Sequence, residues 1–406
     1  MDNSITSGST SNHPGVSRRG ALTVGGAAAI AGMIGTSPAV GAPGGSGKSK
    51  EIPLKFNSDG RFKVVQFNDT QDTHRTDKRT IELMERTLDS EKPDFALING
   101  DVITGGMTTE LQVMQALNHV VFPMEDRGIP WAITFGNHDE DSMAQTGMDE
   151  PRMLRFVQSY GHNLNQTDPD DLTGTGNGNL LIRSSRGIGP AFNLWLIDGG
   201  RYAPDKIAGQ NFEGYPGWDW IRADQVSWYR DQSARLEKQY GMKVPSLMFF
   251  HIALWEHRFM WFSSVDSRTD ADHERAMEKH QIVGERNEDE CPGPFNSGMY
   301  SALQERGDVK GVFVGHDHIN TYVGDYYGIQ LGYGPGTGFA PYGLGDATKN
   351  NLRGARIFEL DESHPGVLKD SRLIFAKDFD IDLSPSGQPL EDPHRLDRVQ
   401  LDYRSR

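Results

Sequence analysis

The sequence predicts an α/β protein whose buried strands end on polar residues, and three observations lead to this prediction. Short apolar runs rich in Val, Ile, Phe and Leu recur along the chain and are bounded by Gly, Pro or Asn, which is typical of buried strands. Segments with apolar residues at helical spacing lie between several of these runs. Five of the runs are followed, directly or after a single Gly, by Asn or His, with Asp close behind in four of them, and α/β sheets bind ligands at the carboxyl ends of their strands.

The predicted elements follow one another along most of the chain. The segment Asp77–Glu91 carries apolar residues at helical spacing and ends before Pro93, so it is expected to be a helix. The other expected helices are Glu110–Val121, Met148–Tyr160, Arg222–Tyr240 and one that follows residues 294–300. The expected strands are Phe62–Phe67, Phe95–Ile98, Trp131–Phe135, Asn179–Arg183, Ala191–Ile197, Leu247–Phe250, Gly311–Val314, Arg356–Leu360 and Arg372–Phe375.

The polar residues at the five strand ends are of types that bind metal ions. Carboxylate and amide oxygens suit hard cations, and imidazole nitrogens suit zinc, iron and manganese. Two ions roughly 3.5–4 Å apart can clamp both oxygens of a phosphoryl transfer, and ions so close need a shared anionic ligand. Asp101 is the expected bridge. The other expected ligands are Asp69, Gln71 and His318 for the first ion, and Asn137, His251 and His316 for the second.

In type and order, these motifs resemble those of the calcineurin-like metallophosphoesterases, most closely an exported bacterial branch related to the purple acid phosphatases. The family pattern is D-x-H, GD, GNH[DE], a lone His after a strand, and GHxH. The corresponding residues are Asp69-Thr70-Gln71, Gly100-Asp101, Gly136-Asn137-His138-Asp139, His251 and Gly315-His316-Asp317-His318, and the resemblance covers roughly residues 60 to 375. It implies two packed mixed β-sheets flanked by helices in a four-layer sandwich, with a dinuclear metal site at the strand ends.

The resemblance also implies a reaction. Hydrolysis of phosphate monoesters is expected, by attack of a hydroxide bound to two divalent ions, which are expected to be Mn, Fe or Zn. Two alternatives stay open. One is a phosphodiesterase that uses the same centre, and the other is a catalytically weak protein that binds phosphate ligands on this fold.

Two residues of the third motif are expected to act on the substrate instead of binding metal. In the family that this chain resembles, the residue corresponding to His138 lies over the phosphate. A positioned imidazole there can stabilise charge in the transition state or protonate the leaving oxygen. Asp139 is expected to orient this imidazole and favour its protonated form. Glu256 and His257 closely follow the fourth motif and could line the substrate pocket.

The chain departs from the family pattern at two positions. Gln71 stands where the family usually has His, and a neutral amide oxygen is a weaker donor to a transition metal. A second D-x-H reading, Asp72-Thr73-His74, makes His74 an alternative ligand. Thr104 stands where purple acid phosphatases carry the Tyr that binds ferric iron, which argues against a purple Fe(III) centre.

The termini predict export and an extension beyond the catalytic domain. Residues 1–42 are expected to be a twin-arginine signal peptide, with Arg18 and Arg19 before an apolar stretch that is too short and Gly-rich for a stable membrane span. The alternative is a disordered Ser/Gly-rich tail that happens to contain two Arg. A linker over 43–55, a catalytic domain over 56–377 and a loosely docked, charged extension over 378–406 follow. The expected location is secreted or in the cell envelope.

Net charge and cysteine content limit the classes of molecule that this protein is expected to bind. The formal net charge of -15 argues against binding nucleic acid through a basic surface. Cys291 is the only cysteine, so an intramolecular disulfide is impossible and a thiolate metal site is not expected. The expected partners are therefore a phosphate ester and the twin-arginine export machinery.

Overall fold

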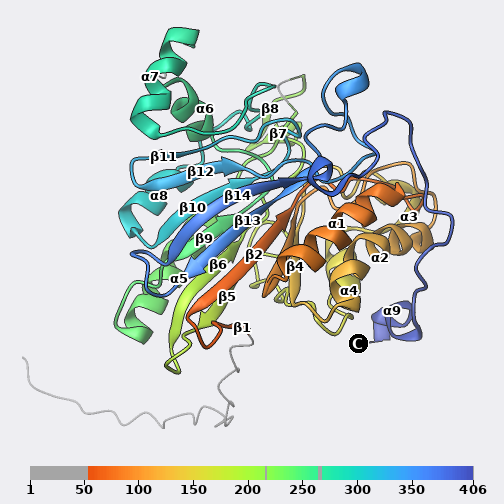
Figure 1. Cartoon of the computed structure of the whole chain (residues 1–406), viewed down its shortest axis with the longest axis horizontal. Helices are drawn as coiled ribbons and strands as arrows, with labels where there is room; N and C mark the ends of the chain where they lie inside the picture. Colours follow the sequence, from red (N-terminus) through yellow and green to blue (C-terminus); the bar gives the residue numbers. More distant parts are fainter. Residues whose placement is uncertain (1–53, 215–216, 264–267, 406) are drawn as a thin grey trace, which may run out of the picture. The chain divides into compact units, whose positions relative to one another are not determined.

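The structure is a computed structural model that describes residues 54–214, 217–263 and 268–405. The expected signal peptide and residues 43–53 of the expected linker lie outside this part of the chain. Glu51–Arg406 forms one compact unit. Its centre is a pair of mixed β-sheets (Figure 1).

The first sheet carries the strands of the three N-terminal motifs. Its strands are β2 (Arg61–Phe67), β3 (Phe95–Asn99), β4 (Trp131–Thr134), β13 (Gly354–Asp361) and β14 (Leu368–Phe375). Their order across the sheet is β14-β13-β2-β3-β4. The strands β2, β3 and β4 are parallel, so their carboxyl ends lie at one edge, whereas β13 runs antiparallel to both β2 and β14.

The second sheet carries the strands of the two remaining motifs. Its strands are β1 (Leu54–Lys55), β5 (Gly178–Arg183), β6 (Pro190–Leu196), β9 (Ser246–Phe249), β10 (Val309–Val314), β11 (Val323–Tyr326) and β12 (Ile329–Tyr333). Their order is β1-β5-β6-β9-β10-β12-β11, with β6, β9, β10 and β12 parallel. A separate short hairpin pairs β7 (Lys206–Ile207) with β8 (Gln210–Asn211).

Helices cover the outer faces of both sheets. They are α1 (Lys78–Glu91), α2 (Glu110–Asp126), α3 (Met143–Thr146), α4 (Glu150–Val157), α5 (Ala223–Tyr240), α6 (Trp255–Phe262), α7 (Asp270–His280), α8 (Met299–Arg306) and α9 (Arg398–Leu401). Short 3-10 turns lie at Asp346–Thr348, Ala376–Phe379 and Tyr403–Ser405. Within the described ranges, none of the helices combines the length and the apolar character that crossing a bilayer requires.

Three hydrophobic clusters hold the layers together. Because successive residues of a strand face opposite sides, Val64 of β2 packs between the two sheets while Val65 packs outward. The cluster around Val65 joins the first sheet to α1, α2 and α4. A third cluster joins the second sheet to α5, α6, α7 and α8. These layers confirm the predicted fold class of two packed mixed sheets flanked by helices.

The carboxyl ends of the two sheets are joined at one edge. The side-chain amide of Asn99, at the end of β3, donates to the carbonyl oxygens of Phe250 at 3.0 Å and Phe313 at 3.2 Å. These carbonyls lie at the ends of β9 and β10, in the other sheet. Because this buried amide is the hydrogen-bond donor to both carbonyls, it fixes the position of the end of β3 relative to the ends of β9 and β10. All five motif strands therefore deliver their last residues to a common region.

The C-terminal extension is firmly docked, and the prediction of loose docking was wrong. Arg79 of α1 is 1% exposed, and its guanidinium donates to the carbonyl oxygens of Asp382 at 3.1 Å, Ser384 at 2.7 Å and Ser386 at 2.9 Å. The extension then runs along the α1 and α2 side of the molecule to α9 (Figure 1). The sequence concealed this because a buried Arg that satisfies backbone carbonyls looks like any charged helix residue.

Most predicted elements are present, with shifted ends. Helix α2 continues through Pro123 to Asp126 because its buried face continues, with Met124 fully buried. Helix α4 occupies only Glu150–Val157 of the predicted Met148–Tyr160. Helices α3, α6, α7 and α9 were not predicted.

Candidate metal centre

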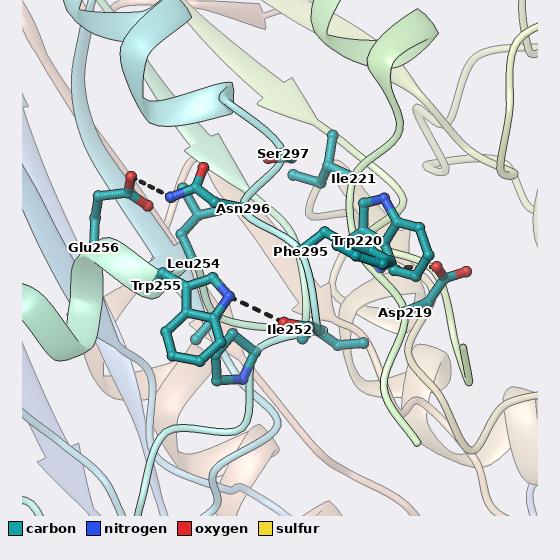
Figure 2. A pocket seen from close by; sticks show the side chains of 14 residues that line it. Asp219, Trp220, Ile221, Ile252, Leu254, Trp255, Glu256, Phe295, Asn296 and Ser297 are labelled. Carbon is teal, nitrogen blue, oxygen red and sulfur yellow. Dashed lines mark hydrogen bonds between the residues drawn. The ribbon is translucent and has the colours of Figure 1, made fainter. Parts of the chain in front are cut away.

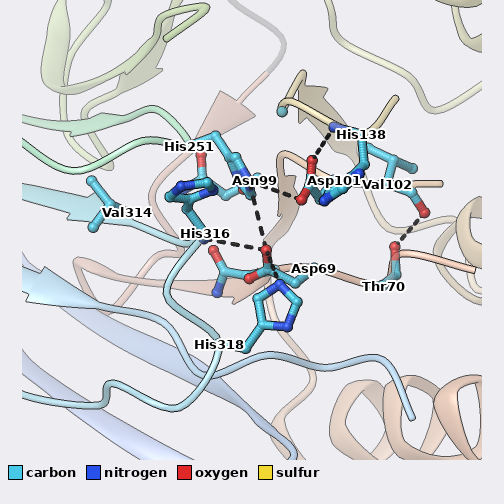
Figure 3. Close-up of polar contacts among 12 residues, drawn as sticks. Asp69, Thr70, Asn99, Asp101, Val102, His138, His251, Val314, His316 and His318 are labelled. Atoms are coloured by element: carbon cyan, nitrogen blue, oxygen red, sulfur yellow. Dashed lines mark hydrogen bonds and ion pairs between the residues drawn. The ribbon is translucent and has the colours of Figure 1, made fainter. Parts of the chain in front are cut away.

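Five polar side chains from four strand ends meet in a buried cluster (Figure 3). One group of possible ligand atoms within 4.8 Å of one another comes from Asp101, His251 and His316, and a second comes from Asp69, Asp101 and His318. Asp101 belongs to both groups. The structure therefore brings together, from distant parts of the chain, five of the residues that the sequence predicts as ligands.

Close approaches between carboxylates and imidazoles define the centre. The Nε2 atom of His251 lies 3.2 Å from Oδ2 of Asp101 and 3.6 Å from Oδ1 of Asp69. The Nε2 atom of His318 lies 3.4 Å from the same oxygen of Asp69. All of these side chains are buried. Such a concentration of charge and lone pairs away from water is costly unless something of opposite charge is bound there.

Several buried atoms at the centre have no hydrogen-bond partner among the residues that the structure describes. They are Oδ2 of Asp69, Oε1 of Gln71, Oδ2 of Asp101, Oδ1 and Nδ2 of Asn137, and Nε2 of His251. Buried polar atoms normally find partners, so this set, in which every atom except the donor Nδ2 of Asn137 is an acceptor, indicates a bound cation. The oxygens and imidazole nitrogens present fit divalent transition metals.

The ring of His251 is held in the orientation that a metal ligand requires. Its Nδ1 lies 3.0 Å from the carbonyl oxygen of Asn99 and donates to it, which leaves the lone pair of Nε2 facing the carboxylates. Two glycines make room for the ring. A Cβ at Gly100 would lie 2.3 Å from Nδ1 of His251, and one at Gly136 would lie 2.4 Å from Oδ1 of Asp101.

Four of the predicted ligands have left-handed backbone conformations. The φ angles are 48° at Asp69, 36° at Gln71, 47° at Asp101 and 71° at His316. Such conformations are uncommon outside glycine and concentrate at functional sites. Backbone hydrogen bonds support them, for example from Gln71 N–H to the carbonyl of Asp101 at 2.9 Å. The turns aim the side chains away from the strand direction and toward one another.

Gln71 and Asn137 lie a few residues beyond the ends of β2 and β4, and the buried amide oxygen of each has no hydrogen-bond partner among the described residues. His74, the alternative ligand, lies elsewhere. Its Nε2 is 3.4 Å from the amide nitrogen of Gln112 on α2. The metal-ligand groups among the described residues include neither His74 nor any cysteine. The geometry therefore favours Gln71 over His74 beside the first group.

His138 lies at the edge of the centre and is linked to it through its backbone. Its N–H donates to Oδ1 of Asp101 at 2.8 Å, while its ring remains partly exposed. The Nδ1 atom of the ring is 2.6 Å from Oδ2 of Asp141. Burial alone would lower the pKa of His138, but the hydrogen bond and charge of Asp141, together with the charge of Asp101, raise it above its ordinary value. The protonated ring is therefore favoured.

Arg201 fixes the carboxylate that holds this ring. Its guanidinium lies 3.1 Å from Oδ1 of Asp141 and 2.7 Å from Oε2 of Glu140. Its Nε also donates to the backbone carbonyl of Asn137 at 3.3 Å. A planar guanidinium that binds two carboxylates and a carbonyl is a rigid support. Arg201 thus ties His138 to a distant segment of the chain.

The prediction that Asp139 orients His138 was wrong, since Asp141 does so. Both oxygens of Asp139 accept backbone hydrogen bonds, from Ile103 N–H at 3.0 Å and from Gly136 N–H at 2.7 Å. Burial and the nearby charge of Asp101 raise the pKa of Asp139 to about 7. Asp139 therefore links the segments that follow β3 and β4, and its carboxylate oxygens are bound to backbone N–H groups instead of to the imidazole of His138.

The charges of the centre interact strongly. Burial would raise the pKa of Asp101, but the charge and hydrogen bond of His251 lower it below its usual range. Burial would lower the pKa of His251, but Asp101 and Asp69 raise it to about 10. For His316, burial and the positive charge of His251 lower the pKa well below its ordinary value. The carboxylates of Asp69 and Asp101 thus favour positive charge at the position that Nε2 of His251 faces, as a bound cation would supply it.

A narrow crevice is lined by residues that follow His251 in the chain (Figure 2). Its lining includes Ile252, the residue directly after His251. Glu256 lines it and accepts from the amide of Asn296 at 2.9 Å, whereas His257 is fully buried and not part of the lining. Of the two pocket residues suggested by the sequence, the structure places only Glu256 there.

Several residues at the site were not predicted. Asp141 stands three positions after His138, and its place in an acidic run could have suggested the pairing. No local signal marks Arg201, Tyr202, Trp218 or Tyr342, which reach the centre from loops outside the motifs. Loop residues of this kind are found only when the fold places them.

Comparison with known proteins agrees with this geometry. The calcineurin-like phosphoesterase profile matches residues 62–320, more than half of the chain. The Arabidopsis thaliana protein named "Probable inactive purple acid phosphatase 14" is 32% identical over 323 residues, covering 71% of this chain and 74% of that protein. "Phosphatase DCR2" of Saccharomyces cerevisiae is 28% identical over 288 residues, covering 66% of this chain and 46% of that protein. A solved dimetal phosphatase from Danio rerio has 12% identity and a TM-score of 0.42, covering 78% of this chain and 99% of that chain. With its cluster of divalent-metal ligands, the chain belongs to the calcineurin-like phosphoesterase family of metal-dependent phosphoester hydrolases.

Proposed function

We propose that this protein is an exported phosphatase that hydrolyses phosphate monoesters with two divalent ions, drawn from Mn, Fe and Zn. The observation that carries the proposal is the pair of ligand groups that share Asp101, with partly exposed His138 beside them. The ligands of one ion would be Asp69, Gln71, Asp101 and His318, and those of the other Asp101, Asn137, His251 and His316. When bound, the ions would supply Lewis acidity and lower the pKa of water.

His138 is the residue of this chain that moves a proton. Hydrolysis forms one bond between phosphorus and a water oxygen and breaks the bond to the leaving oxygen, which must gain a proton. Because Asp141 accepts from Nδ1, the other ring nitrogen, Nε2, is available to donate that proton. The raised pKa of His138 keeps this proton in place until the bond breaks.

A phosphodiesterase is the second candidate, and the state of Arg201 favours it. A monoester dianion carries more charge than a diester and gains from an additional free cation. The guanidinium of Arg201 is already bound by Glu140 and Asp141, so it is not free to pair with that charge. The two activities would use the same centre on substrates that differ in charge and in the number of ester groups on phosphorus.

The test compares two substrates on protein of defined metal content. Metal-free protein is reloaded separately with Mn, Fe or Zn and assayed with 4-nitrophenyl phosphate and with bis(4-nitrophenyl) phosphate. A larger kcat/KM for the monoester supports the proposal, and a larger value for the diester supports the second candidate. Asp101→Asn protein serves as the control for contaminating hydrolases.

Absence of turnover with every metal would refute both activities. The word "inactive" in the name of the Arabidopsis relative makes this outcome worth a direct measurement. If both sites fill and inorganic phosphate binds without turnover, the protein is a phosphate-ligand binder on this fold.

The export part of the proposal rests on Arg18, Arg19 and the apolar stretch after them. Changing both to Lys should retain the protein inside cells that carry the twin-arginine pathway, because that pathway reads the paired arginines. Cell fractionation of the wild-type and doubly changed chains measures this. Equal export of the two chains would refute the proposal.

A further inference from the structure

Aromatic rings from three loop positions contact the histidines of the centre. Trp218 meets the ring of His316 edge-on, with the ring centres 4.5 Å apart at 83°. Tyr342 stacks on His318, with the ring centres 4.1 Å apart at 14°. The hydroxyl of Tyr202 lies 3.3 Å from Nδ1 of His138. The motifs supply none of these rings.

Tyr202 and Trp218 form one rigid wall. Their backbones pair as a β-bridge, supported by a hydrogen bond from Asp219 N–H to the carbonyl of Arg201 at 3.0 Å. Their rings are stacked, with the centres 5.8 Å apart at 30°. Tyr202 is nevertheless 40% exposed, so part of this aromatic surface faces solvent. A fixed, exposed ring beside a reaction centre is suited to contact a ligand.

Tyr342 is fixed in a similar way. Its hydroxyl donates to Oε2 of Glu288 at 2.8 Å, and its backbone carbonyl accepts from buried Arg353 at 2.9 Å. Tyr342 as a whole residue is 49% exposed. The ring is therefore held from two sides while much of it remains open to solvent.

Carboxylates accompany the rings. The hydroxyl of Tyr202 donates to Asp141, at 3.2 Å from Oδ1, just as that of Tyr342 donates to Glu288. Arg201, the cation beside Asp141, is already bound by two carboxylates. A second anionic group on the ligand would therefore meet negative charge near the rings, whereas an uncharged aromatic group would not.

We propose that Tyr202, Trp218 and Tyr342 form an aromatic rim that binds the leaving group, and that the substrate is a phosphate ester of a planar aromatic alcohol without further negative charge. This inference rests on the proposed function, because it takes the phosphate to lie over the metal centre. It narrows the substrate class from any phosphate ester to one with an aryl or arylmethyl group.

The test measures binding, so it does not depend on turnover. Benzylphosphonate and cyclohexylmethylphosphonate carry the same head group and rings of similar size, but only the first ring is planar and aromatic. Neither has a P–O–C bond to hydrolyse. Isothermal titration of the metal-loaded protein should show benzylphosphonate binding about tenfold more tightly, as expected for stacking on more than one ring. A 4-carboxy group on the benzyl ring should weaken binding.

Matched variants locate the effect. Trp218→Leu and Tyr342→Leu keep an apolar side chain but remove the ring, and each should reduce the preference about threefold, whereas Trp218→Phe and Tyr342→Phe should retain it. Tyr327→Leu is the control, since Tyr327 is 61% exposed and lies in the turn before β12, away from the end that faces the centre. Its preference should equal that of the wild type.

Each outcome bears on the proposal. A preference below about twofold in the wild type, or one that survives both Leu changes together, would overturn the rim. Preferential binding of benzylphosphonate by a protein without turnover would support the rim and refute the hydrolase. Turnover without the preference would refute the rim alone. If neither phosphonate binds the metal-loaded protein, both proposals are overturned.

Discussion

The metal centre and a second group of histidines beside α2 differ in their neighbours, and the neighbours give the two groups different chemistry. In the metal centre, His251 and His318 lie within 3.6 Å of carboxylate oxygens from Asp69 and Asp101. In the second group, buried His119 of α2 meets His394 of the C-terminal extension edge-on at 5.8 Å, with His74 nearby.

Among the residues that the structure describes, the ring of His119 has no carboxylate partner. His119 donates from Nδ1 to the hydroxyl of Thr76 at 2.9 Å, since that hydroxyl gives its own proton to the carbonyl of Thr73. Burial, with the charges of His394 and His74, lowers the pKa of His119 to about 4. In the metal centre, by contrast, carboxylates raise the pKa of His251 to about 10. The neighbouring carboxylates thus distinguish the candidate cation site from His119, whose neutral form is favoured by burial.

The strongest test of this difference is to remove charge from the shared carboxylate. Asp101→Asn should lower metal content and reduce turnover by at least about 10³-fold, because a neutral amide cannot bridge two cations. Metal analysis and 4-nitrophenyl phosphate assays measure this. His119→Asn should leave metal content unchanged. Full metal loading and activity in Asp101→Asn would contradict the assignment.

His138→Ala should separate catalysis from metal binding. The variant should keep its metal and lose roughly 10²- to 10⁴-fold in kcat, the usual worth of a general acid. The loss should be greater for alkyl phosphates than for 4-nitrophenyl phosphate, since a poor leaving group depends more on protonation. Equal losses for both would indicate charge stabilisation alone, and loss of metal would make His138 a ligand.

The dependence of the free energy of unfolding on pH should test the lowered pKa of His119 in the second group. Unfolded His119 takes up a proton below about pH 6.5, but the folded protein does so only near pH 4. Above about pH 6.5 the neutral ring of His119 therefore costs no stability. As the pH falls toward 4, the free energy of unfolding decreases by up to about 3 kcal/mol, because only the unfolded chain takes up the proton. Urea unfolding from about pH 7 to about pH 4 measures it. His119→Asn should flatten this dependence, and an unchanged slope would contradict the account.

Asp141→Asn and Asp139→Asn form a matched pair. Asp141→Asn should lower kcat about 10- to 100-fold with metal retained, because it removes the charge that orients and protonates His138. Asp139→Asn should instead destabilise the fold by about 1–3 kcal/mol, since one backbone N–H loses its acceptor. Pairing kcat with thermal unfolding separates the two. The reverse pattern would restore Asp139 as the orienting residue.

The smallest expected effect concerns Gln71. Replacing Gln71 by His should tighten one of two metal-binding steps about tenfold, because imidazole is a better donor to a transition metal than an amide oxygen. Titration of metal-free protein with Zn or Mn resolves the steps. If neither step changes, Gln71 does not contact the metal. His74→Ala is the control and should leave both steps unaltered.

Much of the fold could be predicted because local patterns carry it. The apolar runs at β2, β3, β4, β9 and β10 match the strands to within about two residues at their ends, since buried strands need continuous apolar residues. The missed helices α6 and α7 lie where burial is shared among aromatic and charged residues without clear spacing. Docking of the C-terminal extension depends on Arg79 reaching backbone carbonyls more than 300 positions away, which no local pattern encodes.

By itself, the sequence determined which residues are the candidates to carry the chemistry. Asp, Asn and His directly after buried strands are specified residue by residue, so their types, their order and their place at the strand ends can be read directly along the chain. Only the tertiary structure decided how they are supported. That His138 is oriented by Asp141 instead of Asp139, and that Tyr202, Trp218 and Tyr342 border the histidines, depends on loops that meet in space. Contacts between distant segments follow from the packing of the two sheets and leave no periodic signal in the chain.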